Sequence, residues 1–213
     1  MLSRASSLFL VPAALLSAIT IGIPMVSWAI DFQPVSPDEL TIRNEPKAPG
    51  APAIILYRQV DRNDNDAHQD EYVRVKILTD EGRKYADVEI PYWKGNLKIT
   101  KFQARTIKPD GSIVNFAGKP FDKTIVKARG LRILAKTFAM PDVTVGSIIE
   151  YSYRIELNSE YVFDSHWIVS DELFTKRARF SLQASPFFLL KVHWRGYLRG
   201  QNLSRTSTGS TSK

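Results

Sequence analysis

The sequence predicts an all-β fold, namely an antiparallel β-sandwich of roughly ten strands with a short N-terminal helix and a disordered C-terminal tail. Two observations predict it. From residue 53 onward, hydrophobic residues recur at every second position, which is typical of strands that bury one face. Turn sequences separate these runs, and strands do not alternate with helices as they would around a parallel sheet.

Residues 1–29 are predicted to be an export signal. A basic Arg4 precedes an apolar run, and Ser27-Trp28-Ala29 places small residues at the two positions that a signal peptidase inspects. We expect cleavage after Ala29 and a periplasmic or cell-envelope location. An uncleaved membrane anchor is the alternative, because the run approaches the ~20 residues of a membrane-spanning helix, although two prolines would interrupt it (Pro12 and Pro24).

Residues 30–52 form a proline-rich N-terminal segment in which one short helix is expected. In Ser36-Pro37-Asp38-Glu39, the serine can cap the helix, the proline suits the first helical position, and the acids suit the first turn. The prolines and the glycine of residues 45–52 cannot continue that helix. This stretch is therefore predicted to be a linker or a strap across the domain.

The predicted β-sandwich domain spans residues 53–195. Hydrophobic residues alternate with polar ones along residues 73–77, 86–90, 149–157 and 174–182. In each run, one set should face a core and the other should face water. The expected water-facing set includes Arg74, Lys76, Glu150, Ser152, Arg154 and Glu156.

Two stretches interrupt the pattern. Residues 125–138 fit either a strand or one face of a helix, and we favour a strand. Leu97 and Ile99 have one parity and Phe102 and Ala104 the other, so a β-bulge is expected near Thr100 or Lys101.

The net charge of +7 is concentrated near the C-terminus. Residues 191–213 hold five basic residues and no acid, and Arg4 adds one charge, which leaves +1 for everything between. A nearly neutral body argues against a nucleic-acid partner. Residues 196–213 are predicted to be a disordered basic tail rich in Ser and Thr. We favour a truncated reading frame as its origin over a natural flexible tail.

The order of several segments is distinctive. Residues 57–60 and 70–78 would form an opening hairpin, and residues 104–111 follow with Ala-Arg-Thr-Ile-Lys-Pro-Asp-Gly. Residues 138–151 read Phe-Ala-Met-Pro-Asp-Val-Thr-Val-Gly-Ser-Ile-Ile-Glu-Tyr. In this order they resemble DUF3857, a family of bacterial exported domains of unknown function, over about residues 53–190. The resemblance implies a β-sandwich that precedes a transglutaminase-like domain and has no assigned activity of its own.

The sequence indicates no catalytic, cofactor-binding or metal-binding residue. It contains no cysteine, which excludes a thiol nucleophile and disulfide bonds. It has no Gly-x-Ser-x-Gly motif for a serine hydrolase. Ser165 and His166 are adjacent on a predicted strand and would point to opposite faces. The three histidines lack the spacing of metal ligands (His68, His166 and His193).

Residues 61–72 resemble a calcium-binding loop in part. Asp61, Asn63 and Asn65 occupy its first three ligand positions, but Asp66 stands where the turn needs glycine and Tyr72 where a bidentate acid is needed. We therefore expect a polar surface loop. A metal-dependent hydrolase that uses residues 61–70 is the less favoured hypothesis.

Two further sets of residues could form binding surfaces. A basic stretch could meet an anionic polymer or lipid headgroup, but acids such as Asp87 and Glu89 could neutralise it, so we expect a solvated sheet face. A set of aromatic residues could line a sugar-binding face, but alternation favours the core. The basic residues are Lys94, Lys98, Lys101, Arg105 and Lys108, and the aromatic ones are Tyr151, Tyr153, Tyr161, Phe163 and Trp167.

These observations predict an exported domain without enzymatic activity or cofactor. We expect it to be an accessory or interaction module whose partner is a transglutaminase-like domain or another envelope protein. An independent module that binds cell-wall carbohydrate or peptidoglycan is the alternative. Contact with a membrane is expected only if the signal segment stays uncleaved.

Overall fold

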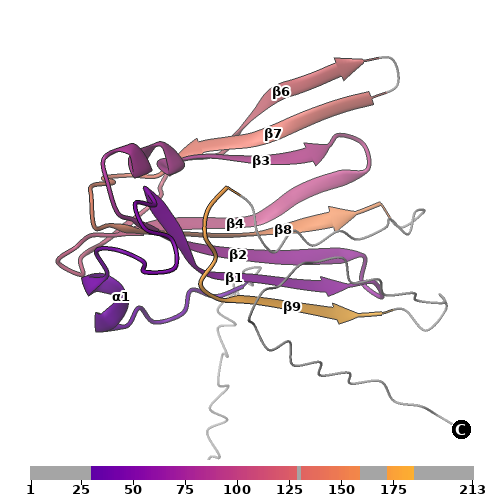
Figure 1. Ribbon diagram of the computed structural model, residues 1–213. Helices are drawn as coiled ribbons and strands as arrows, with labels where there is room; N and C mark the ends of the chain where they lie inside the picture. The colour runs from indigo at the N-terminus through magenta and orange to yellow at the C-terminus, as the bar shows by residue number, and fades with distance from the viewer. Residues whose placement is uncertain (1–29, 129–130, 159–171, 185–213) are drawn as a thin grey trace, which may run out of the picture.

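A computed structural model describes residues 30–128, 131–158 and 172–184 of the chain (Figure 1). Within these residues, the strands build two sheets, which confirms the predicted all-β fold. The predicted signal segment, the tail, and the predicted site residues Tyr161, Phe163, His166, Trp167 and His193 lie outside them. In the described part of the chain, no helix is long and apolar enough to cross a membrane.

The larger sheet has six strands in the order β5-β4-β8-β2-β1-β9. Antiparallel pairing places Arg74 of β2 opposite Glu150 of β8, and Glu150 opposite Arg105 of β4. This register brings three charged side chains to the same face of the sheet. The strands are β1 (Ala53–Asn63), β2 (His68–Ile77), β4 (Leu97–Ile107), β5 (Ile113–Asn115), β8 (Ile148–Leu157) and β9 (Ala178–Gln183).

The smaller sheet has three antiparallel strands in the order β3-β7-β6, comprising β3 (Asp87–Trp93), β6 (Phe121–Ala128) and β7 (Leu131–Ala139). Figure 1 shows the β6–β7 hairpin projecting away from the six-stranded sheet. The strands β6 and β7 confirm the strand interpretation of residues 125–138.

One strand departs from the predicted antiparallel arrangement. The strand β9 pairs with β1 in parallel, from Arg58 opposite Ala178 to Asn63 opposite Gln183. About twenty residues separate the end of β8 from the start of β9, and a crossover of a dozen or more residues is what a parallel connection requires. Alternation along residues 174–182 showed a strand there but carried no information about its direction.

The two local predictions with a stated mechanism are confirmed. The helix α1 (Pro37–Thr41) begins with a capping box, in which Ser36 accepts from the Glu39 N–H and the Glu39 carboxylate accepts from the Ser36 N–H. The pairing of β4 with β8 shifts between Thr100 and Gln103, and Lys101 adopts a positive φ of 48°. This is the expected bulge, and it reconciles the two parities of β4.

A short 3-10 helix, η1 (Glu81–Ala86), joins β2 to β3. The Pro52 carbonyl accepts hydrogen bonds from the N–H groups of Leu78 and Thr79, at 2.9 and 3.1 Å. A Cβ on Gly82 would lie 2.1 Å from that same carbonyl oxygen. Glycine is therefore required at position 82, and the Pro52 backbone is fixed where the N-terminal segment passes into β1.

The hydrophobic core lies between the two sheets. Val73, Val75 and Ile77 of β2 face Val88 and Ile90 of β3 within one buried cluster. Aromatic rings fill its centre, with the ring centroids of Phe102 and Phe138 4.6 Å apart. Tyr153 is buried and Tyr151 packs against the cluster, which confirms the core assignment for these two tyrosines. We call this side of the six-stranded sheet the core face.

Candidate functional site

The opposite side of the six-stranded sheet is polar, yet it is covered. Residues 30–45, which we call the strap, run along it and include α1, and we call this side the strap face. The sequence predicted that Arg74, Lys76, Glu150 and Ser152 face water, and this prediction is wrong, because each of them is at least 98% buried. The period of two separates the faces of a strand correctly but does not reveal that a distant segment covers the polar one.

Three charged residues at the centre of the strap face form a buried ion triad. The Nε atoms of Arg74 and Arg105 each lie 2.6 Å from one oxygen of the Glu150 carboxylate, which is completely inaccessible to solvent. The Tyr72 hydroxyl donates a hydrogen bond to Glu150 as well. Burial and the Glu150 charge raise the pKa of Tyr72, so this hydroxyl stays protonated. The carboxylate therefore keeps three donors in a site without water access.

The strap is held mainly through its backbone carbonyls. Arg74 Nη2 donates to the Gln33 carbonyl at 2.7 Å, and Lys76 Nζ donates to the Leu40 carbonyl at 2.8 Å. At the start of the strap, the Ile30 carbonyl accepts from Gln103 at 2.8 Å and from Ser152 at 2.9 Å. Side chains of three different strands thus bind the main chain of one segment.

Charged contacts secure the strap at two further points. The Glu39 carboxylate lies 2.7 Å from Arg74 Nη1, so the capping residue of α1 also reaches the triad. At the end of the strap, Glu45 pairs with Lys176 at 3.1 Å, and this hydrogen bond lowers the pKa of Glu45. A small apolar cluster supports them, in which Val35, Leu40 and Ile42 pack on Ile54 and Ile148.

Lys76 has the most strongly altered basic group of the strap face. Burial, followed by the charge of the nearby Arg43, lowers its pKa to about 8, and Glu39 opposes both effects. Its Nζ also donates to the Gly146 carbonyl at 2.6 Å, where Gly146 has a φ of 87° that favours glycine. The lysine therefore joins the strap to the turn before β8.

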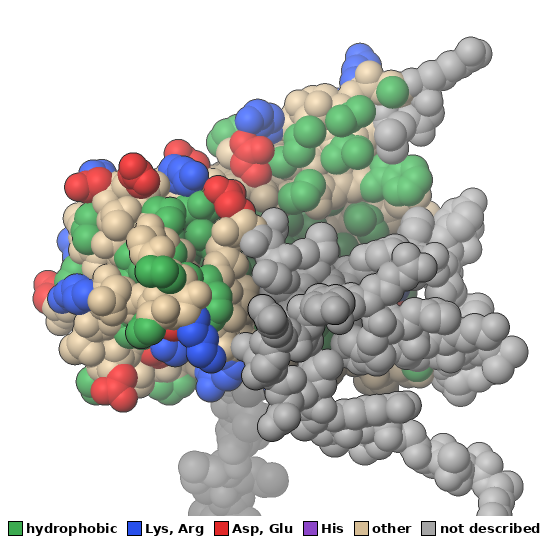
Figure 2. Space-filling view, viewed as in Figure 1, with side chains coloured by type: hydrophobic (Ala, Val, Ile, Leu, Met, Phe, Trp, Pro, Cys, Tyr) green, Lys and Arg blue, Asp and Glu red, His purple; other side chains and the backbone are tan. Residues whose placement is uncertain are grey.

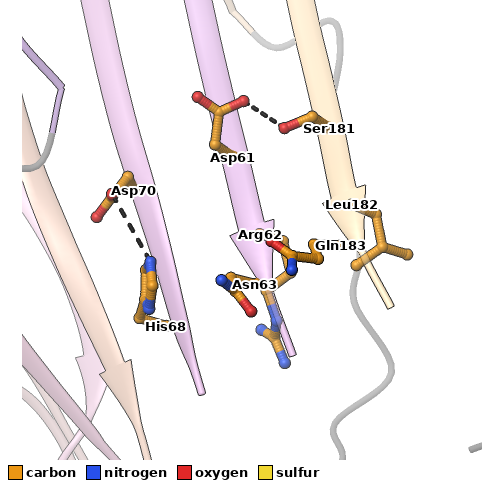
Figure 3. A pocket seen from close by; sticks show the side chains of 8 residues that line it. All are labelled: Asp61, Arg62, Asn63, His68, Asp70, Ser181, Leu182 and Gln183. Carbon is orange, nitrogen blue, oxygen red and sulfur yellow. Dashed lines mark hydrogen bonds and ion pairs between the residues drawn. The ribbon is translucent and has the colours of Figure 1, made fainter. Parts of the chain in front are cut away.

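A pocket of about 280 Å³ opens at the far end of the strap face, where β2, β1 and β9 end (Figure 3). Asp61 and Asp70 lie directly opposite each other in its wall. Asp70 accepts two hydrogen bonds of 2.6 Å from Arg154, and Asp61 accepts one from Ser181. His68 approaches Asp70 at 3.9 Å. Both carboxylates are thus already engaged by side chains of the protein.

The structure separates the residues of the partial calcium loop. Asp61 lines the pocket, whereas the Asn63 side chain accepts from the N–H groups of Asn65 and Asp66 and so shapes the hairpin turn. Tyr72 lies far along β2, in the buried triad. In residues 30–128, 131–158 and 172–184, no three His, Cys, Asp or Glu side chains gather where they could hold a metal ion.

The basic stretch is neutralised, but not by the predicted acids. Lys98 pairs with Glu156 at 3.6 Å, Lys108 pairs with Asp142 at 3.2 Å, and Arg105 enters the triad. Of the two acids named from the sequence, Glu89 pairs with Lys123 of β6 instead. The reason is that β3 and β4 belong to different sheets, although they are consecutive in the chain.

The three-stranded sheet carries exposed hydrophobic side chains. Phe121, Ile125 and Val126 of β6 are 60%, 47% and 37% exposed, and Trp93 of β3 is 39% exposed. Figure 2 shows hydrophobic side chains gathered on this part of the molecule. In the described part of the chain, β6 is an edge strand, and each of its eight residues is exposed. We call these four residues and their sheet the apolar sheet surface.

Neither the buried triad nor the apolar sheet surface was identified from the sequence. The signal for the triad was the placement of opposite charges at matching positions of strands that later prove to be neighbours, which needs the register of β2, β8 and β4. The signal for the surface was a run with hydrophobic residues at adjacent positions, Ile125 and Val126, which alternation assigned ambiguously.

Comparison with known proteins gives one family and one distant structural likeness. No curated protein matches the chain. The solved structure of a candidate protease from Parabacteroides distasonis is similar with a TM-score of 0.41 and 15% identity, over 50% of this chain and 23% of that one. The chain thus corresponds to less than a quarter of that protein. Residues 63–213 match DUF3857, a domain of unknown function with solved structures, and the chain belongs to this family.

Proposed function

We propose that this protein is an exported, non-catalytic β-sandwich domain that docks onto a transglutaminase-like domain or another envelope protein through its apolar sheet surface. The observation that carries the proposal is the group of large hydrophobic side chains exposed on one small sheet. Such patches on soluble proteins mark interaction sites, since exposure of Phe and Ile to water is unfavourable. Membership of DUF3857 supports it through the family's resemblance to domains that precede transglutaminase-like ones.

The absence of a thiol supports a non-catalytic role next to such an enzyme. Transglutaminase chemistry requires a cysteine thiolate, and the chain contains no cysteine. The enzyme domain would therefore supply the nucleophile, and this domain would supply the surface on which it sits. The contact would be formed by a sheet that can keep its shape, because β7 is paired on both sides, with β3 and with β6.

A binding experiment with a matched control tests the proposal. The mature chain is titrated against a purified transglutaminase-like domain of a DUF3857-containing protein, with binding followed by surface plasmon resonance. The variant Phe121→Ser should weaken binding by at least about tenfold, because a 60% exposed ring would lie in the contact. The control is Ile113→Ser, which removes a hydrophobic side chain of similar exposure, 51%, from β5 in the other sheet.

Three outcomes would contradict the proposal. The first is equal weakening by both variants, or no binding at all to the enzyme domain. The second is retention of the mature chain on insoluble peptidoglycan without any partner, which would favour the cell-wall-binding alternative. The third is hydrolase or acyl-transfer turnover by the purified chain that a single substitution in it abolishes.

A further inference from the structure

The strap is attached to the sheet differently from every strand. It lies on the sheet face rather than at a sheet edge, and its carbonyls accept from side chains of β2, β4 and β8. Contacts to main-chain carbonyls depend little on the identity of the bound residues, which is how proteins hold extended peptide segments. The exception is Glu39, whose carboxylate is recognised by Arg74 at 2.7 Å.

The face beneath the strap differs from the core face in what opening would expose. Removal of the three-stranded sheet would expose Val75, Ile149 and Phe138 to water. Removal of the strap would expose chiefly charged and polar side chains, whose burial is unfavourable in the first place. The strap is therefore the layer that can separate from the sheet at the lower free-energy cost.

An open strap face would be cationic. Arg74, Arg105 and Lys76 contribute three positive charges at neutral pH, Glu150 contributes one negative charge, and Glu39 leaves with the strap. Two arginines and a lysine in a row along β2 and β4 match an extended segment that offers carbonyls and a carboxylate.

We infer that the strap face is a binding groove for an extended acidic peptide segment, and that residues 30–45 are its resident occupant, able to leave without unfolding of the sandwich. The inference is independent of the apolar sheet surface, which lies on the other sheet. A partner with a main chain in the same position and an acid at the Glu39 position would compete with the strap for the groove.

The first test measures opening of the strap by thiol labelling of the full chain, which has no natural cysteine. Ser152→Cys places a thiol under the strap, and Thr106→Cys places one on the core face, both at positions that are 0% exposed. If the strap opens locally, the thiol at position 152 should react about 100-fold faster than the thiol at position 106 with a labelling reagent in native buffer. Equal rates would overturn the inference, because both sites would then open only on global unfolding.

The second test measures binding in trans. A fluorescent peptide with the sequence of residues 30–45 is titrated against the full chain and against its Glu39→Gln variant. The variant weakens the resident strap and leaves the groove residues intact, so the peptide should bind it at least about tenfold more tightly than the natural chain. The matched control is Glu172→Gln, which changes an exposed glutamate elsewhere and should leave peptide binding as in the natural chain.

A second peptide checks the chemistry of recognition. The same peptide with Glu39→Gln should bind the Glu39→Gln chain at least about tenfold more weakly than the natural peptide, because Arg74 loses its carboxylate partner. Absence of trans binding, or equal binding of the two peptides, would overturn the inference.

Discussion

The two faces of the six-stranded sheet are buried to similar depths by opposite chemistry. Ile148 and Ile149 are neighbours on β8, and both are inaccessible to solvent. Ile149 belongs to the core between the sheets, whereas Ile148 belongs to the small cluster under the strap, next to the ion triad. The core face gains stability from apolar burial. The strap face depends on pairing among charges, so a loss on each face has a different physical origin.

The largest expected effect is on the strap face. Glu150→Ala would leave Arg74 and Arg105 without their shared carboxylate, and the loss of one partner from a buried ion pair costs roughly 3–5 kcal/mol of unfolding free energy. Urea denaturation of both proteins checks this value. A loss below about 1 kcal/mol, in the range of surface pairs, would show that water reaches the triad and that the strap does not seal it.

The matched isoleucines compare apolar burial on the two faces. Ile149→Ala should cost about 4 kcal/mol and Ile148→Ala about 2 kcal/mol, both within the range for buried isoleucine. The reason for the difference is that the strap can settle into the cavity left by Ile148, whereas two paired sheets cannot close around Ile149. Denaturation in urea measures both. Equal losses would mean that the strap is as rigid as the three-stranded sheet.

Stability should also depend on pH through Lys76. Its pKa is lowered to about 8 in the folded state by burial first, and the ordinary value near 10.5 applies when the chain is unfolded. Between these pH values the unfolded state binds more protons, so stability rises as pH increases from about 8 to about 10.5. The unfolding free energy of the natural chain minus that of Lys76→Met should increase by about 2 kcal/mol between pH 7.5 and 10.5.

The difference from Lys76→Met cancels the tyrosines and other lysines that titrate in the same range. If the difference were flat across this range, Lys76 would be solvated in the folded protein. The strap would then cover it less completely than its hydrogen bonds to Leu40 and Gly146 indicate.

The smallest expected effect comes from an exposed ion pair. Lys98 and Glu156 lie 3.6 Å apart, with 74% and 45% of their side chains accessible. Lys98→Gln should change the unfolding free energy by less than about 0.5 kcal/mol, since water and salt screen such pairs. Denaturation at low and high ionic strength measures it. A larger loss would show that this end of β4 contributes to the charge network of the strap face.

The comparison of the two faces also shows what the sequence could predict. Alternation along Val73, Val75 and Ile77 found the core face, the parity change around Lys101 found the bulge, and Ser36 with Glu39 found the helix start. Each of these depends on residues close together in the chain. The strap face depends on contacts such as Arg74 with Glu39 and Ser152 with Ile30, which join residues 35 and 122 positions apart.

The candidate sites were harder to predict than the fold for the same reason. Asp61 and Asp70 were noted as polar loop residues, but only the β1–β2 register places them opposite each other in a pocket wall. The parallel direction of β9 could not be predicted either, since a strand has the same period in both directions. Phe121 could be identified as hydrophobic, but its exposure follows from the edge position of β6.

The fixed Pro52 carbonyl has a mechanical consequence. The carbonyl is gripped by Leu78, Thr79 and the close approach of Gly82, whereas the strap before it is attached by separate side-chain contacts. Tension applied at Ile30 would therefore peel those contacts off one after another and stop at Pro52. Beyond that point, the paired backbones of β1 and β2 would have to shear together, so a tether at the N-terminal side loads the removable layer before the sandwich itself.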